Sequence, residues 1–139
     1  MNKTIAMKWV KALRSGKYKQ GQGALCEVTT KGTKHCCLGV LTDLYQKECK
    51  RKKKKALTVK KFYALIDDNT MTESYVEAYG STKETEILPL KVKKWARMCS
   101  RRGDIETDVY CGLDLIEMND DGVSFKKIAS VIEKNYEAL

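Results

Sequence analysis

Residues 25–45 have the sequence LCEVTTKGTKHCCLGVLTDLY, and this stretch decides the fold. Its first part alternates in the manner of a β-strand from Leu25 to Thr30, and Lys31-Gly32-Thr33 then supplies a turn. A second strand from Lys34 to Cys37 completes a β-hairpin, which we predict over about residues 24–38. The apolar run from Leu38 to Leu41 indicates the end of that strand and its entry into a helix.

Three further helices are predicted around this stretch. The spacing of apolar residues predicts an amphipathic helix over Thr4 to Ser15, which stops at Gly16. Leu88-Pro89 begins another helix, which continues to Cys99, and Ser124 can cap a last helix. The first helix has the apolar face Ile5, Trp9, Val10 and Leu13. The helix after Pro89 has the apolar face Val92, Trp95, Ala96 and Cys99 and a basic outer face of Lys91, Lys93, Lys94 and Arg97. The last helix has the apolar face Phe125, Ile128, Ala129, Val131 and Ile132.

The remaining segments carry weaker patterns. Val59 to Ile66 predicts a short strand or a helical turn, and Met71 to Tyr79 predicts one arm of a second hairpin. Arg101 to Asp104 is predicted as a loop, and Leu113 to Met118 as an apolar stretch. Together the patterns predict an α+β fold, in which about four helices pack on a small, mostly antiparallel sheet.

The length of 139 residues and the apolar fraction of 42% predict a single domain over residues 1–139. Lysine and arginine residues interrupt the first apolar stretch, so the sequence predicts no signal peptide. No apolar run reaches the roughly 18 residues that a membrane span needs. We therefore expect a cytoplasmic protein without a membrane partner.

The six cysteines are expected to be mostly free thiols, since a chain without an export signal stays in a reducing compartment. A zinc site built from Cys26, His35, Cys36 and Cys37 is the alternative. However, zinc ligands usually lie about two to four residues apart, and neighbours on a strand point to opposite faces. Buried thiols that act as small apolar side chains are favoured, and no metal or cofactor is predicted.

The net charge of +9 is concentrated in one place. The basic surface segment at residues 47–61 contains nine lysine or arginine residues and one glutamate, whereas residues 104–139 carry a net charge of −6. A solvated surface and a contact with nucleic-acid phosphates are equally open interpretations of this segment. It offers no aromatic residue for base stacking within its central run, so contact with the phosphate backbone is favoured over base recognition; that run is Lys50, Arg51, Lys52, Lys53, Lys54 and Lys55.

The loop after the first helix is the best candidate for a ligand site. Residues 15–23 hold three glycines together with lysine, tyrosine and glutamine, so backbone N–H groups, cations and a ring can reach one phosphorylated ligand. The loop matches no Walker or dinucleotide fingerprint, and a plain connection between helix and strand is the alternative. Asn119, Asp120 and Asp121 could bind a cation, but a turn whose side chains bond the nearby backbone is favoured. The predicted ligand-binding residues are Arg14, Ser15, Tyr18, Gln20, Lys34, His35, Asn119 and Asp120.

The sequence contains no evident catalytic set. His35 is the only histidine, and the predicted hairpin places Cys37 on the same strand face. Adjacent side chains on one face seldom point at each other as a base and a nucleophile must. We therefore predict a non-enzymatic protein, and loss of turnover on changing His35 would be the mark of an enzyme.

A series of short motifs runs through most of the chain. The most specific is Cys36-Cys37-Leu38-Gly39-Val40-Leu41; the others are Trp9-Val10, Ala12-Leu13-Arg14-Ser15-Gly16, Tyr18 with Gln20-Gly21, Tyr79-Gly80, Leu88-Pro89 with Val92 and Trp95-Ala96, and Met118-Asn119-Asp120 with Gly122, Ser124-Phe125, Ile128-Ala129 and Ile132-Glu133. With these motifs the chain resembles a widespread family of small phage-encoded proteins without an established general function. Arg97-Met98 stands where that family tends to have Gly-Leu, and the lysine run has no counterpart in it.

The resemblance implies a viral protein that acts in the cytoplasm of an infected bacterium. Small phage proteins of this kind are often accessory factors that block a host protein or sequester a nucleotide second messenger. Our hypothesis is a counter-defence protein that binds a phosphorylated, nucleotide-like ligand and sequesters it. The alternatives are a nucleic-acid-binding module that uses residues 47–61 and an inhibitor that binds a host defence protein; assembly into homo-oligomers stays open.

Overall fold

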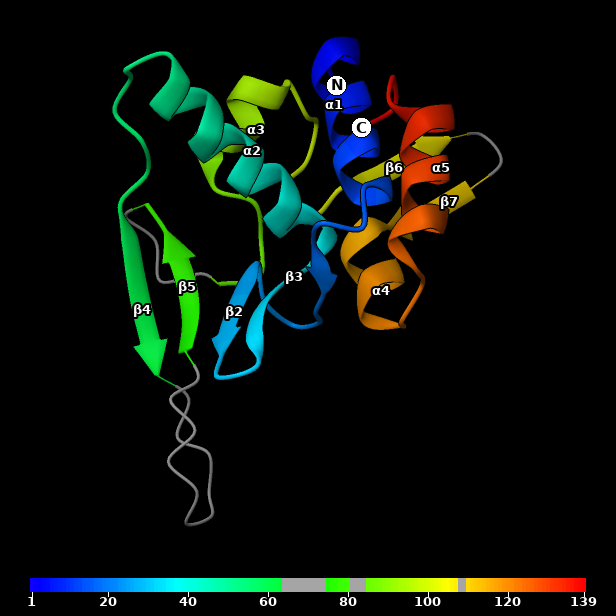
Figure 1. The fold of residues 1–139 in the computed structure, drawn as a ribbon. Helices are drawn as coiled ribbons and strands as arrows, with labels where there is room; N and C mark the ends of the chain where they lie inside the picture. The colour runs from blue at the N-terminus through cyan, green and yellow to red at the C-terminus, as the bar shows by residue number, and fades with distance from the viewer. Residues whose placement is uncertain (64–74, 81–84, 108–109) are drawn as a thin grey trace.

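The computed structural model describes the backbone of residues 1–63, 75–80, 85–107 and 110–139 (Figure 1). These residues form an α+β fold with five helices, a five-stranded sheet and a two-stranded sheet. The helices are α1 (Lys3–Arg14), α2 (Cys37–Arg51), α3 (Leu90–Ala96), α4 (Leu115–Asp120) and α5 (Phe125–Asn135). The strands are β1 (Lys19–Gln20), β2 (Cys26–Thr29), β3 (Gly32–His35), β4 (Val59–Tyr63), β5 (Tyr75–Tyr79), β6 (Asp104–Thr107) and β7 (Tyr110–Asp114).

The larger sheet has the strand order β1-β3-β2-β5-β4 and is mostly antiparallel, as the sequence predicts. Its centre is the β2–β3 hairpin, in which Cys26 lies opposite His35. β4 and β5 form a second antiparallel hairpin that joins the first through β5 and β2, whereas β1 pairs with β3 in parallel. The segment from Val59 is thus a strand, and β5 confirms the second hairpin arm; the predicted beginning of that arm at Met71 lies outside the described residues.

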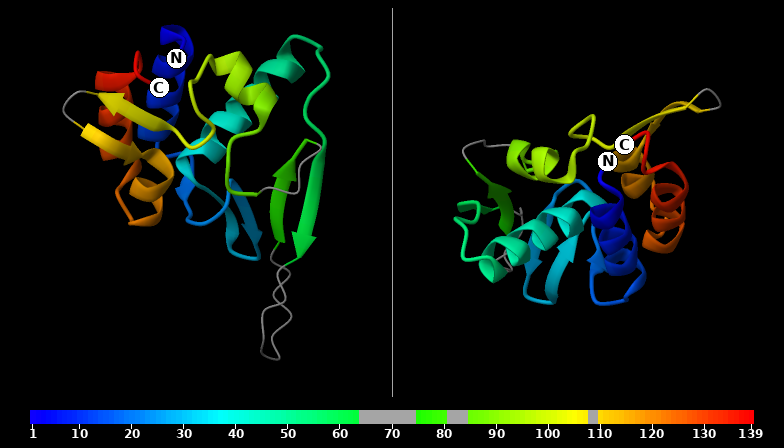
Figure 2. Two further views of the ribbon diagram at one scale, coloured as in Figure 1. Left: turned by 180° about the vertical axis from the view of Figure 1, so that it is seen from behind. Right: turned by 90° about the horizontal axis from the view of Figure 1, so that it is seen from above.

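The helices lie on two sides of the core. α1 and α5 pack side by side, and α2 and α3 lie together over the other half of the molecule (Figures 1 and 2). The β6–β7 hairpin lies behind α1 and α5 in Figure 1 and in front of them in the left view of Figure 2. The core between these layers includes the fully buried side chains of Trp9, Leu25, Leu38, Leu41, Leu88, Leu115, Ile128 and Ile132.

The first hairpin ends earlier than predicted, because helix α2 already begins at Cys37. Cys36 is its N-cap in an extended conformation, and the Cys36 thiol accepts a hydrogen bond from the Gly39 N–H at 3.3 Å. The prediction that Leu38 to Leu41 end a strand is therefore wrong, since this buried run forms the first turn of the helix. For the same reason His35 and Cys37 do not share a strand face.

Gly39 lets the start of α2 lie directly against the backbone at the start of the hairpin. A Cβ added to Gly39 would lie only 1.6 Å from the Leu25 carbonyl oxygen. Beside this contact, the buried Trp9 ring of α1 donates a hydrogen bond from Nε1 to the Cys37 carbonyl oxygen at 2.9 Å. The most specific motif of the chain is thus the place where α1, α2 and the hairpin join.

The third helix is shorter than predicted. α3 ends at Ala96, because Arg97 takes a left-handed backbone conformation with φ of +55°. Cys99, predicted to belong to its apolar face, lies beyond the helix and is exposed. The segments Asp104–Thr107 and Tyr110–Asp114 then pair as the antiparallel strands of the β6–β7 hairpin, which the sequence patterns did not predict.

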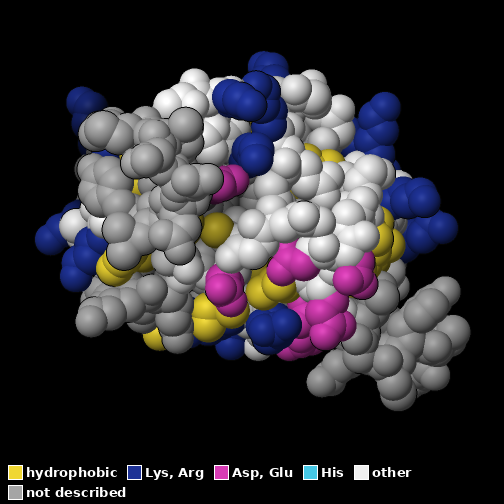
Figure 3. All heavy atoms as spheres, turned by 90° about the horizontal axis from the view of Figure 1, so that it is seen from below, with side chains coloured by type: hydrophobic (Ala, Val, Ile, Leu, Met, Phe, Trp, Pro, Cys, Tyr) yellow, Lys and Arg dark blue, Asp and Glu magenta, His cyan; other side chains and the backbone are white. Residues whose placement is uncertain are grey.

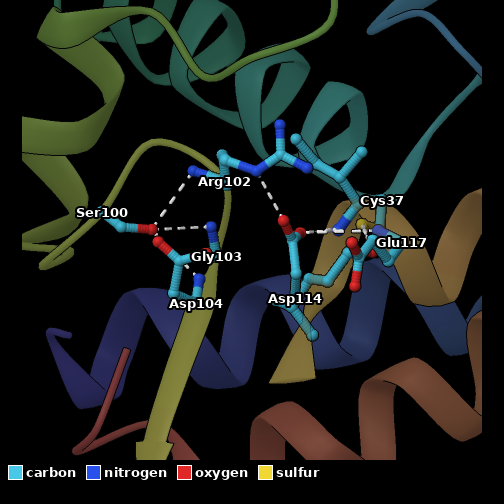
Figure 4. A network of polar contacts seen from close by, with 9 residues as sticks. Cys37, Ser100, Arg102, Gly103, Asp104, Asp114 and Glu117 are labelled. Atoms are coloured by element: carbon cyan, nitrogen blue, oxygen red, sulfur yellow. Dashed lines mark hydrogen bonds and ion pairs between the residues drawn. The ribbon is translucent and has the colours of Figure 1, made fainter. Parts of the chain in front are cut away.

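A polar network fixes this hairpin between α3 and α4 (Figure 4). The Ser100 hydroxyl accepts hydrogen bonds from the N–H groups of Arg102, Gly103 and Asp104 at 3.2, 2.9 and 3.0 Å. Asp114 is the N-cap of α4, and its carboxylate also accepts a hydrogen bond from Arg102 Nε at 2.5 Å. These side chains are therefore engaged in holding the fold together.

Candidate functional site

Gln20 and Asn119, two predicted ligand-binding residues, bind each other inside the protein. Asn119 is fully buried; its side chain donates to the Gly21 carbonyl oxygen at 2.8 Å and accepts from the Cys37 N–H at 3.1 Å. Gln20 Nε2 donates to Asn119 Oδ1 at 3.3 Å, and Gln20 Oε1 accepts from the Phe125 N–H at 3.0 Å. Both amides are thus occupied in joining the loop to α2, α4 and α5.

The neighbouring Asp120 and Ser124 belong to the same junction. Asp120 Oδ1 accepts a hydrogen bond from the Gly23 N–H at 3.0 Å. Ser124 occupies the N-cap position of α5 as predicted, but its side chain makes no capping hydrogen bond there. Gln20 from the distant loop accepts instead from the first N–H of the helix, that of Phe125, which local sequence reasoning did not anticipate.

Arg14 and Ser15 lie apart from this junction, whereas Lys34 lines a pocket of about 380 Å³ together with Gln20 and Asn119. Arg14 Nη2 lies 2.6 Å from Glu133 Oε2, an exposed ion pair that joins α1 to α5. The Ser15 hydroxyl donates to the Ala12 carbonyl oxygen at 2.6 Å, and Lys34 lies 3.6 Å from Glu27 across the hairpin. The structure therefore brings Gln20, Lys34 and Asn119 to one pocket and places Arg14 and Ser15 elsewhere.

Tyr18 and His35 do come together, in a pocket of about 440 Å³ beside α2. Their rings meet edge-on with centroids 5.4 Å apart. The Tyr18 hydroxyl donates to Asp43 at 2.5 Å and accepts from Lys47 at 3.0 Å, while Lys47 lies 2.6 Å from the same Asp43 carboxylate. This pocket contains several titratable groups, which makes it the natural place to look for catalysis.

The protonation states in the Tyr18–His35 pocket do not favour phosphate binding or a nucleophilic thiol. Burial lowers the pKa of His35, which keeps the imidazole neutral at pH 7. Burial also raises the pKa of the Cys26 thiol to about 12, with a further contribution from the nearby Glu77 carboxylate. The lining lysines, Lys17 and Lys47, are balanced by the carboxylates of Asp43 and Glu77.

A second pocket, of about 340 Å³, has a strongly positive lining. Its lining comes from the C-terminal half of α2, the residues that follow it and α3, and these two helices lie at the top of Figure 1. Half-buried Trp95 and Tyr45 contact each other there, with ring centroids 5.4 Å apart. We call it the lysine–tryptophan pocket; its lining residues are Tyr45, Glu48, Cys49, Lys52, Lys54, Lys55, Lys91, Lys94 and Trp95.

Local structure brings the lysines of two separate segments to this pocket. After α2, Lys53 has a left-handed φ of +53° and the Lys54 N–H donates to the Cys49 carbonyl oxygen at 2.8 Å. These features form the usual reversal after a helix, which turns the chain toward α3. On α3, Lys91, Lys94 and Trp95 are three and four residues apart and so share one helix face.

Charge in the lysine–tryptophan pocket is only partly compensated. Glu48, the one carboxylate of the lining, pairs with Arg51 at 2.9 Å and with Lys52 at 2.7 Å. Hydrogen bonds from these two cations lower the pKa of Glu48 to about 2. Over the described part of the chain, no carboxylate forms an ion pair with the other four lysines of the lining, which are Lys54, Lys55, Lys91 and Lys94.

The opposite end of the molecule is acidic. Figure 3 shows acidic side chains gathered on the face seen from below. The exposed carboxylates of α4 and the turn after it are Glu117, Asp120 and Asp121. This separation of charge directs an anionic ligand toward the end with α2 and α3.

The described residues contain no group of three or more histidine, cysteine, aspartate or glutamate side chains that could hold a metal ion. The thiols of the zinc alternative have other partners: Cys36 caps α2, and Cys37 Sγ lies 3.3 Å from the Leu115 carbonyl oxygen, to which it donates. Among the described helices, none has the length and apolar character that crossing a membrane requires.

Fold and site together define a small α+β domain with a basic, aromatic pocket between two helices. The chain belongs to the family described as a domain of unknown function, DUF8296, whose family model matches residues 1–136. No curated protein and no solved structure matches the chain.

Proposed function

We propose that this protein binds a phosphorylated, nucleotide-like ligand in the lysine–tryptophan pocket. The observation that carries the proposal is a half-buried tryptophan surrounded by four lysines that have no carboxylate partner within the described residues. An indole face stacks on any nucleobase, and lysine ammonium groups bind phosphate oxygens. We therefore propose α2 and α3 as the site, in place of the glycine-rich loop that the sequence analysis favoured.

The size of the pocket agrees with this ligand class. Its volume of about 340 Å³ lies in the lower part of the range of small-molecule sites, roughly 300 to 1,000 Å³. A base on Trp95 leaves its phosphate at the rim, where Lys54, Lys55, Lys91 and Lys94 lie. The six-residue basic run that the sequence analysis singled out contributes its last two members to this rim.

The biological role that we propose is sequestration of a nucleotide second messenger of host defence. It rests on the binding chemistry above and on the resemblance to small phage proteins. Single-stranded nucleic acid presents the same base and phosphate groups to the pocket. The binding experiment must therefore distinguish a free nucleotide from a nucleic-acid strand.

Tryptophan fluorescence tests the site directly, because the protein has two tryptophans and Trp9 is fully buried in the core. Titrations should use a mononucleotide, a cyclic dinucleotide and short single strands of RNA and DNA. A bound base is expected to quench Trp95. Trp95→Ala removes this reporter and is titrated by calorimetry instead; it is expected to weaken binding by about 5- to 150-fold, the equivalent of roughly 1 to 3 kcal/mol of stacking. If several lysines contact a strand, the affinity should also fall steeply as salt is raised.

A charge-matched control separates the pocket from general positive charge. Lys54→Ala with Lys91→Ala removes two charges from the pocket, and Lys126→Ala with Lys127→Ala removes two exposed charges from α5. The first pair is expected to lower affinity at least about tenfold, equivalent to 1.4 kcal/mol, and the second to change it little. Equal losses from both pairs, or no quenching by any ligand, would contradict the proposal.

A further inference from the structure

A second hollow adjoins the lysine–tryptophan pocket and has a different lining. It has a volume of about 390 Å³ and is formed by the segment after α2, the end of β5 and the start of α3. Lys55 and Lys91 line both hollows, so these two side chains lie at the boundary between them. We call it the leucine hollow; its remaining lining residues are Ala56, Leu57, Thr58, Lys60, Tyr79, Gly80, Pro89 and Leu90.

The leucine hollow has an apolar surface without a partner in the described structure. Leu90 is 53% exposed, the most exposed of the large apolar side chains that the structure describes. It lines the hollow together with Pro89 and Leu57, and the charged residues of this lining are the three lysines Lys55, Lys60 and Lys91. An exposed apolar surface ringed by cations suits a ligand that is flat and apolar in one part and anionic in the next.

We propose that the ligand spans both hollows as two nucleotides joined by a phosphodiester. This inference rests on the proposed function and names its ligand class. One base stacks on Trp95, the linking phosphate lies between Lys55 and Lys91, and the second base covers Leu90 in the leucine hollow. The bases must be unpaired to enter the hollows, so the ligand is a free dinucleotide or a segment of single strand, and not a duplex.

The sharing of Lys55 and Lys91 by both hollows supports one linked ligand over two independent mononucleotides. Lys55 and Lys91 serve both hollows, and two separate phosphates held by the same two lysines would repel each other. A single phosphodiester carries one negative charge to this shared position. Joining the two bases also makes the second contact intramolecular, which raises affinity without any new contact.

The test compares a mononucleotide, a linear dinucleotide, a cyclic dinucleotide and a single-stranded octamer by calorimetry and Trp95 quenching. A dinucleotide is expected to bind at least about tenfold more tightly than the mononucleotide. Leu90→Ala should remove most of that advantage and leave mononucleotide affinity unchanged. Phe62→Ala is the matched control, since Phe62 is a 38% exposed apolar side chain outside both linings.

The outcomes separate this inference from the proposed function. Equal affinities for mononucleotide and dinucleotide, with Trp95→Ala still weakening both, would overturn the spanning ligand and leave the single-nucleotide site intact. An unchanged dinucleotide affinity in Leu90→Ala would also overturn it. No binding of any ligand would overturn both. Once the dinucleotide advantage is established, an octamer that binds much more tightly assigns the ligand to a single strand, and an octamer equal to the dinucleotide assigns it to a free dinucleotide.

Discussion

Gly39→Ala is expected to destabilise the protein strongly, although it adds only one methyl group. The new Cβ would lie 1.6 Å from the Leu25 carbonyl oxygen, whereas real Cβ atoms stay at least about 3.0 Å from such a neighbour. The start of α2 would have to move away from the hairpin by roughly 1.4 Å, the difference between these two distances. Neither partner can yield by a rotamer change, because the obstacle is backbone.

The energetic cost follows from the hydrogen bonds that this movement breaks. Three of them hold the start of α2: Cys36 N–H to the Ala24 carbonyl at 3.3 Å, Cys37 N–H to Asn119 Oδ1 at 3.1 Å, and Trp9 Nε1 to the Cys37 carbonyl at 2.9 Å. Leaving such buried groups unpaired costs about 1 to 3 kcal/mol each, against a gain of about 1 kcal/mol in helix propensity for alanine over glycine. We expect a net loss of about 2 to 8 kcal/mol, a large part of the total stability of a domain.

Urea denaturation followed by circular dichroism measures this loss. Gly16→Ala is the matched control, because Gly16 has a φ of +70° and no atom of the described residues lies within 4 Å of the position that its Cβ would take. Its cost should be limited to about 1 to 2 kcal/mol of backbone strain. A Gly39→Ala protein within about 1 kcal/mol of the parent would refute the reasoning.

Three further predictions concern stability. Asn119→Asp places a carboxylate against the Gly21 carbonyl oxygen in a fully buried position and should cost about 3 kcal/mol in urea denaturation, whereas Asn2→Asp, which keeps its capping oxygen for the Ile5 N–H, should change stability by less than about 0.5 kcal/mol. Arg97→Gly relieves a left-handed residue at the end of α3 and should stabilise by about 1 kcal/mol, while Lys93→Gly inside the helix should destabilise by a similar amount; a lower melting temperature for Arg97→Gly would show that strain at this φ is not the cause. Because the folded protein lowers the pKa of His35, the unfolded chain binds its proton more readily, so the contribution of His35 to stability is present above about pH 6.5 and is lost as the pH falls. The drop in melting temperature from pH 7 to pH 5 should be smaller in His35→Gln than in the parent, and an equal drop would exclude His35 as a source of this pH dependence.

Local patterns predicted the α+β class, the first hairpin, the first helix and the last helix. They failed where a short apolar run suits either kind of element: Leu38 to Leu41 belongs to α2 because the Cys36 thiol caps the helix and Gly39 fits against Leu25. The contact of Gly39 with Leu25 joins residues that are distant in sequence, so it leaves no periodic pattern of apolar residues that could predict it. A thiol is also an unusual cap, so the usual search for serine, threonine, aspartate or asparagine passes over it.

The site was harder to predict than the fold. Arg14, Tyr18 and Gln20 are close along the loop, but their side chains bind Glu133, Asp43 and Asn119 in three different parts of the molecule. The components of the lysine–tryptophan pocket were recognised separately, as a basic run and as the basic face of the third helix. Their meeting depends on how α2 and α3 pack, which spacing along one chain does not encode.

The packing of α1 against α5 has a consequence for synthesis. Arg14 contacts Glu133 across 119 positions of sequence, so α1 is synthesised well before the helix that packs against it. At about 5 to 20 residues per second, the apolar face of α1 waits on the order of ten seconds for α5. During that interval the apolar face of α1 lacks the cover that α5 gives it in the folded protein.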